Sequence, residues 1–178
     1  MLSRVFVSCL ILSLCAAAAS SLSCRWMDHK FKDYNTNAIK LLNQMAYNST
    51  NMTDTLVDMD IVSMHQILYV QSAKASVEER LRFIVHMVEE VTTLFKGDTS
   101  GASWEPQKQD DFLNIINQQA SGLRTCLTTT RKSKKLQLFF KKLSDFIQKN
   151  GHTAMSWELV RREIKVLLSV VASPIGTI

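Results

Sequence analysis

The chain has 178 residues, 46% of them hydrophobic, and its 21 Lys and Arg residues against 16 Asp and Glu residues give a net charge of +5. This length suits one domain with a sizeable core, and so small a charge gives no indication of nucleic-acid binding. Two Pro and five Gly residues are too few for a β-sandwich, in which turn residues recur roughly every 8 to 12 positions.

Residues 1–23 have the pattern of a secretory signal peptide. One charge, Arg4, precedes a short apolar run, and small residues follow. The small-residue rule permits cleavage after Ala19 or after Ser23, and we prefer Ser23, which leaves residues 24–178 as a single domain. Because no later run approaches the roughly 20 apolar residues of a transmembrane helix, the sequence predicts a secreted, extracellular protein without membrane insertion.

Two of the four cysteines, Cys9 and Cys15, lie in the signal peptide, which leaves Cys24 and Cys126 in the mature chain. In an oxidising compartment two cysteines are expected to form a disulfide, and two free thiols are the alternative. The bond would close a loop of about 100 residues, for which the chain-entropy model gives on the order of 4 kcal/mol.

After Cys24, apolar residues recur at intervals of three and four, and charged or polar residues lie between them. They predict a first amphipathic helix that ends near Tyr47. Its apolar positions are Phe31, Tyr34, Ala38, Leu41, Leu42 and Met45.

Residues 48–55 are polar and rich in turn-forming residues, which indicates an exposed loop. The loop contains two acceptor sequons for N-linked glycans, at Asn48 and Asn51. On the secretory route we expect a glycan on at least one of them, although sites this close hinder each other. The alternative is that both stay bare.

The pattern next predicts a short helix at about residues 60–72 and a long one at residues 76–96. Ser76 and Glu79 have the spacing of a capping box, in which each side chain accepts a hydrogen bond from the other residue's backbone N–H. Lys96 and Gly97 supply a basic last turn and a glycine stop. The inward residues of the long helix are Leu81, Ile84, Val85, Val88, Val91 and Phe95.

Two further helices follow a loop at residues 98–103. Pro106 suits the first turn of one of them, and Cys126 lies in its last turn. A basic segment at residues 131–135 leads into the other, which ends at Gly151. The inward residues are Phe112, Ile115, Ile116, Ala120, Leu123 and Leu127 in the first, and Leu136, Phe139, Phe140, Leu143, Phe146 and Ile147 in the second.

The last helix, at residues 155–171, has one apolar face and one charged face. The apolar face carries Trp157, Val160, Ile164, Leu167, Leu168 and Val171. On the other side lie Glu158, Arg161, Arg162 and Lys165.

Six helical patterns and no strand pattern predict an all-α bundle. A disulfide between Cys24 and Cys126 would place the start of the first helix beside the end of the fourth, so we expect these two helices to be antiparallel. The long segment of residues 47–75 then serves as a crossover after the first helix. This connectivity is the up-up-down-down arrangement of helical cytokines.

The sequence offers no catalytic or metal-binding constellation. His29, His65, His86 and His152 are scattered, and none has the HxxxH or HExxH spacing of a helical metal site. Hydrolase and nucleotide-binding motifs do not occur. We therefore predict no enzymatic activity, no catalytic residue, no metal and no cofactor, and a protein that works by being bound.

The densest surface feature is the basic stretch from Arg131 to Lys142. It is either a solvated helix start or a binding patch for heparan sulphate or a protein partner. A secreted basic protein that binds glycosaminoglycans or microbial membranes through this stretch is therefore an alternative function.

The stretch from Ala154 to Ile164 resembles the last-helix signature of type I interferons, Cys-Ala-Trp-Glu-x-Val-Arg-x-Glu-Ile. The start Cys24-Arg25-Trp26, the number of helices and Cys126 are similar to the two-cysteine group of teleost fish type I interferons. Met155 stands where the mammalian proteins have a cysteine, so their second disulfide cannot form in this chain.

This resemblance implies an antiviral cytokine that joins two class II cytokine receptor chains and so activates JAK–STAT signalling; we expect it to be a monomer. The receptor contacts that the matched motif implies are Arg161, Arg162 and Lys165. The buried side that it implies consists of Trp157, Val160 and Ile164. Another helical cytokine, such as an interleukin-10 or lambda-interferon relative, is an alternative function of the same kind.

Among the implied contacts we rank Arg161 with Lys165 first, since residues four apart share one face of a helix. In the alternative, Arg161 only pairs with Glu158 or Glu163 on its own helix, a surface contact worth under about 1 kcal/mol.

Overall fold

A computed structural model describes residues 30–45, 64, 66–68, 75–127, 129 and 131–172. Its elements are a first helix at residues 30–45, α3 at Val77–Phe95, the short 3-10 helix η1 at Ser100–Ala102, α4 at Pro106–Arg124, α5 at Lys134–Lys149 and α6 at Ala154–Ala172. Residues 64 and 66–68 are also helical, within the predicted short helix. No strand occurs among the described residues, in agreement with the predicted all-α class. The signal peptide, Cys24, Asn48 and Asn51 lie outside them.

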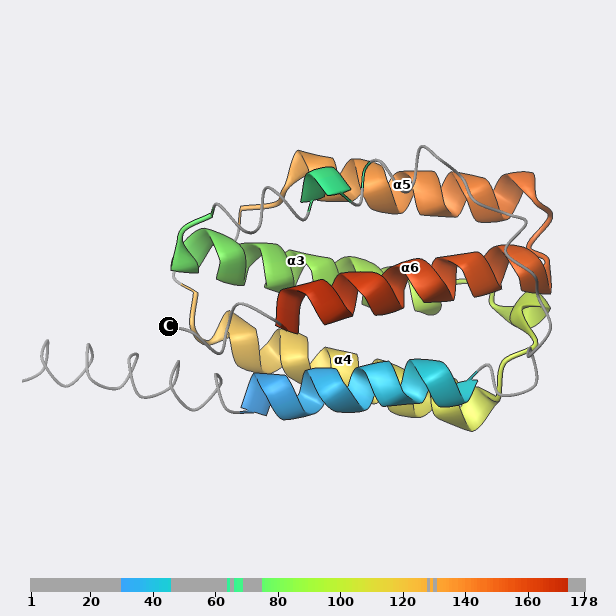
Figure 1. The fold of residues 1–178 in the computed structure, drawn as a ribbon, viewed down its shortest axis with the longest axis horizontal. Coiled ribbons are helices and arrows are strands. Elements are labelled where there is room, and N and C mark those ends of the chain that lie inside the picture. The colour runs from blue at the N-terminus through green and yellow to red at the C-terminus, as the bar shows by residue number, and fades with distance from the viewer. Residues whose placement is uncertain are drawn as a thin grey trace, which may run out of the picture.

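The long helices have the predicted up-up-down-down directions. In Figure 1 the first helix and α3 run from left to right, whereas α4 and α6 run from right to left, and α5 is an additional helix that runs with α3. Two consecutive parallel helices require a connection that crosses the length of the bundle, so the chain between the first helix and α3 is a crossover. The backbone N–H of Glu105 donates to the carbonyl oxygen of Met45 at 3.3 Å, which joins the end of the first helix to the start of α4.

Helix α3 is the central element. All six residues from Phe83 to Val88 are buried, whereas a helix with a single covered face would expose residues on every turn. Figure 1 shows α3 between α5 on one side and α4 on the other. The bundle is therefore built around α3, and the other helices each present an outer face.

The ends of the helices follow local rules with one exception. The predicted capping box is confirmed: the Glu79 N–H donates to Ser76 Oγ at 3.3 Å, and the Ser76 N–H donates to Glu79 Oε2 at 3.0 Å. Pro106 is the first residue of α4, as predicted. Helix α3 ends at Phe95, Lys96 is its C-cap in a right-handed conformation and Gly97 follows, so the predicted stop at Gly97 is confirmed.

The exception concerns Cys126, which was predicted inside the last turn of α4. The helix ends at Arg124, and Thr125 and Cys126 form the turn after it, with the Cys126 N–H donating to the Leu123 carbonyl at 3.1 Å. The side chain of Cys126 is half-buried and packs against the core.

An aromatic cluster fills one end of the core. The ring of Phe95 stacks on Trp104 with centroids 5.1 Å apart, and it also lies 5.0 Å from Phe112. Trp157 meets Trp104 edge to face at 5.4 Å. The segment that brings in Trp104 was predicted to be only a loop, but it contains η1. There the Cα of Gly101 lies so close to the His152 carbonyl that an added Cβ would approach its oxygen to 1.9 Å.

Candidate functional site

Helix α6 is held against the first helix by hydrogen bonds at two levels. Asn35 Nδ2 donates to the Leu168 carbonyl at 2.8 Å. Arg161 Nη1 donates to the Leu42 carbonyl at 2.6 Å. Asn35 and Leu42 are seven residues apart on the first helix, and their partners Leu168 and Arg161 are seven residues apart on α6 in the reverse order. This is the geometry of two antiparallel helices in contact over two turns. This attachment fixes the rotation of α6 and thereby decides which residues face solvent.

The side chain of Arg161 lies inside the bundle. Its residue exposure is 8%, and that of its partner Glu158 is 7%. Nε of Arg161 donates to Glu158 Oε2 at 2.8 Å, and Nη2 donates to Oε1 at 2.5 Å, so the pair is bidentate. The expectation that both residues belong to the exposed side of the helix is therefore wrong. The third contact, to the Leu42 carbonyl, gives the physical reason, since carbonyls late in a helix favour a cation.

The other residues of the matched motif take different positions. Trp157, Val160 and Ile164 are buried, with exposures of 2%, 0% and 0%. Arg162 has a side chain that is 50% exposed, and its Nε lies 3.6 Å from Glu158 Oε1. Lys165 is half-buried. Of the two neighbouring guanidinium groups, that of Arg162 is therefore the exposed one and that of Arg161 is buried.

The outward face of α6 is a continuous row that we call the α6 stripe. It consists of Met155, Arg162, Val166 and Ser169. These residues are separated by seven, four and three positions, so they lie one above the other on a helix. Met155 is 37% exposed and Val166 is 47% exposed, which leaves apolar groups on both sides of Arg162. Sequence reasoning missed Val166, although its spacing of four from Arg162 was a usable signal.

The basic stretch predicted on the surface is divided between two environments. Arg131, Lys132, Lys134 and Lys135 are exposed, and Lys141 forms an ion pair with Asp145 at 2.8 Å. Arg131 and Lys132 also line a pocket together with residues of α3 and α4. The stretch is therefore only one wall of a larger basic surface.

The described residues were also compared with the requirements of a metal site and of a membrane-spanning helix, and they meet neither. Within the described residues, His, Cys, Asp and Glu nowhere gather in threes that could hold a metal ion. No helix in the described part of the chain has the length and apolar character needed to cross a membrane.

Comparisons with known proteins agree on one family. A family model of the interferon alpha/beta domain matches residues 27–177. Interferon a3 of Oncorhynchus mykiss is 29% identical over 160 residues, which cover 89% of this chain and 88% of that protein. Interferon epsilon of Sus scrofa is 19% identical over 180 residues, which cover 92% and 89% respectively.

Two solved fish structures have the same fold. Zebrafish interferon 1 matches with a TM-score of 0.68 at 22% identity, over 83% of this chain and 97% of that chain. Zebrafish interferon 2 matches with a TM-score of 0.58 at 17% identity, over 80% and 97%. Both are helical cytokine bundles, so the predicted fold class is confirmed.

Proposed function

The chain belongs to the interferon alpha/beta family, and we propose that it is secreted and joins two class II cytokine receptor chains, which activates JAK–STAT signalling. Because it belongs to this family, the chain is a cytokine with an antiviral role, and it resembles the type I interferons of fish. It also confirms that the chain is not an enzyme, because interferons are cytokines.

The observation that carries the receptor proposal is the α6 stripe. An arginine flanked by exposed apolar groups is typical of interface anchors, since Arg and Met are enriched in interface cores and Arg among the residues that dominate binding energy. The stripe is also rigid, because the buried contacts of Arg161 and Trp157 fix the helix from behind. Little conformational entropy would be lost when a receptor covers it. We assign the main contact to Arg162, with Lys165 at its edge.

A double variant tests this assignment. Arg162→Glu combined with Val166→Asp reverses the charge and removes the apolar neighbour, so we expect binding to a purified receptor ectodomain to weaken by about 30-fold or more, the equivalent of about 2 kcal/mol. STAT phosphorylation in interferon-responsive fish cells should require correspondingly more protein. Far-UV circular dichroism and the Tm should not change, because both residues are exposed.

Lys134→Glu combined with Leu138→Asp is the matched control. It changes a cation and an exposed apolar residue four positions apart on α5, where Leu138 is 50% exposed. If both double variants bound the ectodomain within threefold of the unaltered protein, the α6 stripe would not be the contact. If the unaltered protein caused vesicle leakage and no STAT phosphorylation, the cytokine mechanism itself would fail.

Processing of the chain belongs to the same proposal. We expect residues 1–23 to be removed, Cys24 to pair with Cys126, and Asn48 or Asn51 to carry a glycan. In Figure 1 α4 ends on the side of the bundle where the first helix begins, and the half-buried Cys126 follows α4 by two residues, which supports the pairing. Mass spectrometry of the secreted protein, digested with and without reduction and with and without glycosidase, tests all three. A mature chain with two alkylatable thiols would contradict the disulfide.

A further inference from the structure

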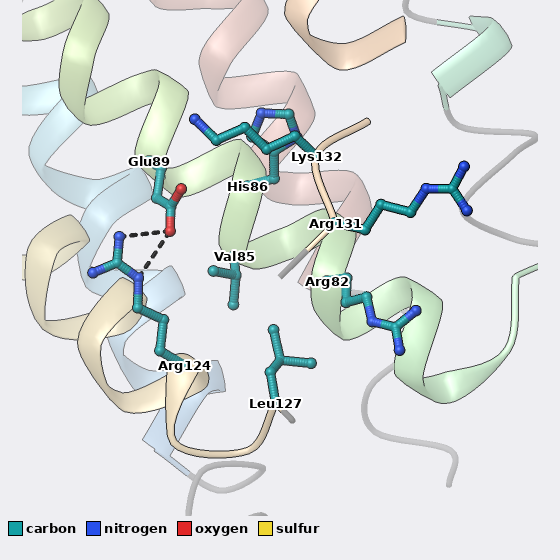
Figure 2. A pocket seen from close by; sticks show the side chains of 8 residues that line it. All are labelled: Arg82, Val85, His86, Glu89, Arg124, Leu127, Arg131 and Lys132. Carbon is teal, nitrogen blue, oxygen red and sulfur yellow. Dashed lines mark hydrogen bonds and ion pairs between the residues drawn. The ribbon is translucent and has the colours of Figure 1, made fainter. Parts of the chain in front are cut away.

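A pocket lies on the side of the bundle where α3, the end of α4 and the segment before α5 meet. Its volume is about 330 Å³. Part of its wall is one face of α3, because the lining residues of that helix are three and four positions apart. Figure 2 shows the lining side chains, which are Arg82, Val85, His86, Glu89, Arg124, Leu127, Arg131 and Lys132. The floor is apolar where Val85 and Leu127 lie, and most of the remaining wall is cationic.

The charges of this wall do not cancel. Four lining residues are Arg or Lys, and Glu89 is the one carboxylate among them. Arg124 already occupies that carboxylate, with Nε and Nη2 donating to Glu89 Oε1 at 2.8 and 2.6 Å. Among the described residues no ion pair involves Arg131 or Lys132, and both are exposed. The pocket therefore has surplus positive charge that an anion would neutralise.

Arg82, on α3, is the cation that lies across the pocket from the segment before α5. Its terminal Nη2 pairs with Glu78, whereas its Nε is buried and has no hydrogen-bond acceptor among the described residues. The Arg82 side chain is nevertheless 25% exposed, so an anion in the pocket can reach it beside its ion pair with Glu78. Figure 2 shows Arg82 and Arg131 extending to the same side of the pocket from different parts of the chain.

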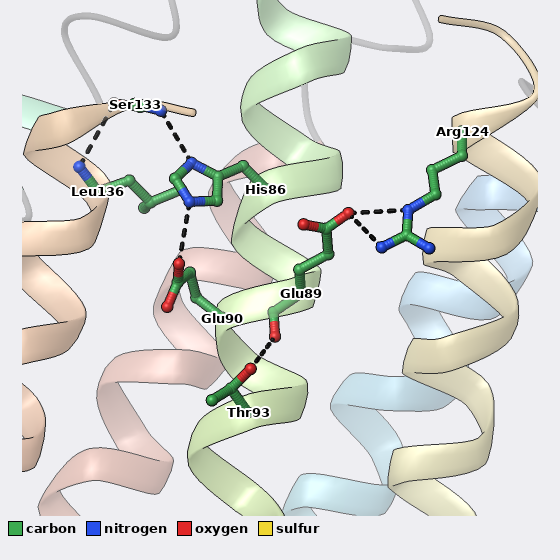
Figure 3. Close-up of polar contacts among 7 residues, drawn as sticks. All are labelled: His86, Glu89, Glu90, Thr93, Arg124, Ser133 and Leu136. Carbon is green, nitrogen blue, oxygen red and sulfur yellow. Dashed lines mark hydrogen bonds and ion pairs between the residues drawn. The ribbon is translucent and has the colours of Figure 1, made fainter. Parts of the chain in front are cut away.

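The basic segment is held in place by His86. The Ser133 N–H donates to His86 Nδ1 at 2.9 Å, so the proton of the neutral ring is on Nε2, which donates to Glu90 Oε1 at 3.0 Å. Ser133 Oγ in turn accepts from the Leu136 N–H at 3.3 Å and caps α5 (Figure 3). Lys132 immediately precedes this anchor. Arg131 and Lys132 are thus positioned against α3 before any ligand arrives, which lowers the entropy cost of binding.

We propose that this pocket is a binding site for a sulfated glycosaminoglycan of the heparan sulfate class. Sulfate groups would be bound by Arg82, Arg131 and Lys132, and the chain would continue over the exposed Lys134 and Lys135 in the first turn of α5. A repeating polyanion suits a pocket that opens onto a row of cations better than a single small anion does. The inference rests on the proposed secretion, because this polymer lies outside cells.

The test is retention on immobilised heparin together with the dissociation constant for a heparin oligosaccharide. Arg131→Ala with Lys132→Ala should weaken binding about tenfold, as expected for the loss of two partly solvated ion pairs. Arg82→Ala is the decisive variant, since Arg82 belongs to the pocket but is remote in sequence from the basic stretch; it should weaken binding about threefold to fivefold. The matched control is Lys141→Ala with Lys149→Ala, which removes two exposed charges of α5 outside the pocket.

Each outcome decides the matter. Weakened binding in the pocket variants, near-normal binding in the control and unchanged STAT phosphorylation support the site. Normal binding by Arg82→Ala with a normal Tm would mean that the linear basic stretch binds and the pocket does not. Equal losses in pocket and control variants, or preference for anionic vesicles over heparin, would overturn the site. Heparin binding without any STAT response would leave the site standing and refute the proposed receptor mechanism.

Discussion

Arg161 shows how one side chain can be assigned to the wrong side of a helix. It lies four positions before Lys165, and on the period of α6 alone both belong to the charged face. Its guanidinium nevertheless makes three buried contacts, two to Glu158 and one to the Leu42 carbonyl. The position of a neighbouring backbone carbonyl cannot be derived from the sequence of α6, and this contact decides the burial. The role of Arg161 is therefore to hold α6 on the first helix.

A stability prediction follows for this residue. Arg161→Leu leaves the buried carboxylate of Glu158 without its bidentate partner, and the half-exposed Arg162, 3.6 Å away, does not replace it, so we expect the free energy of unfolding to fall by about 3 to 5 kcal/mol. Urea unfolding followed by circular dichroism measures the loss. Replacing both residues by leucine should recover much of it, because a buried ion pair can be exchanged for apolar groups at little cost.

The adjacent Arg162→Leu is the control, with an expected change within about 0.5 kcal/mol, since its side chain is half exposed. If Arg161→Leu lowered the free energy of unfolding by less than about 1 kcal/mol, the pair of Arg161 and Glu158 would contribute no more than an ordinary surface ion pair.

At the scale of single elements, sequence reasoning was most successful where local rules decide. The start of α3 at Ser76 and the position of Pro106 in α4 depend only on neighbouring residues, and both were predicted correctly. The end of α4 was not, because a helix end also depends on what the following chain packs against. The 3-10 helix η1 was also not predicted. It lies just before Trp104, which packs in the core against Phe95 and Trp157, and these contacts come from other helices.

The capping box of α3 predicts a dependence of stability on pH. Hydrogen bonds from the backbone N–H and the hydroxyl of Ser76 lower the pKa of Glu79. A lowered pKa in the folded state means that the stabilisation is present above the unfolded value of about 4.3 and is lost as the pH falls through the folded pKa. Glu79→Gln should therefore be less stable than the unaltered protein at neutral pH, and the difference should disappear in acid.

Urea unfolding of both proteins at about pH 7 and about pH 3 measures this difference. Asp110→Asn, at an exposed position of α4, controls for the general loss of a negative charge. A difference between Glu79→Gln and the unaltered protein that is the same at both pH values would show that the carboxylate of Glu79 does not act through its charge.

For the whole molecule, the class and the connectivity could be predicted because helical periodicity and the cysteine count restrict a chain of this length to few arrangements. The candidate surfaces could not, for two different reasons. The α6 stripe depends on the rotation of one helix against another, which Asn35 and Arg161 set through backbone carbonyls. The basic pocket joins Arg82, Arg124 and Arg131, and residues so distant in sequence are brought together only by the packed bundle.

The central position of α3 also restricts how such a protein can change over time. Any substitution between Phe83 and Val88 must satisfy neighbours on every side, so few alternatives are neutral there. The α6 stripe and the segment around Arg131 face solvent and tolerate exchange at little cost to the fold. Adaptation to an altered receptor or to a different tissue surface is therefore open at such exposed positions and restricted in the buried middle of α3.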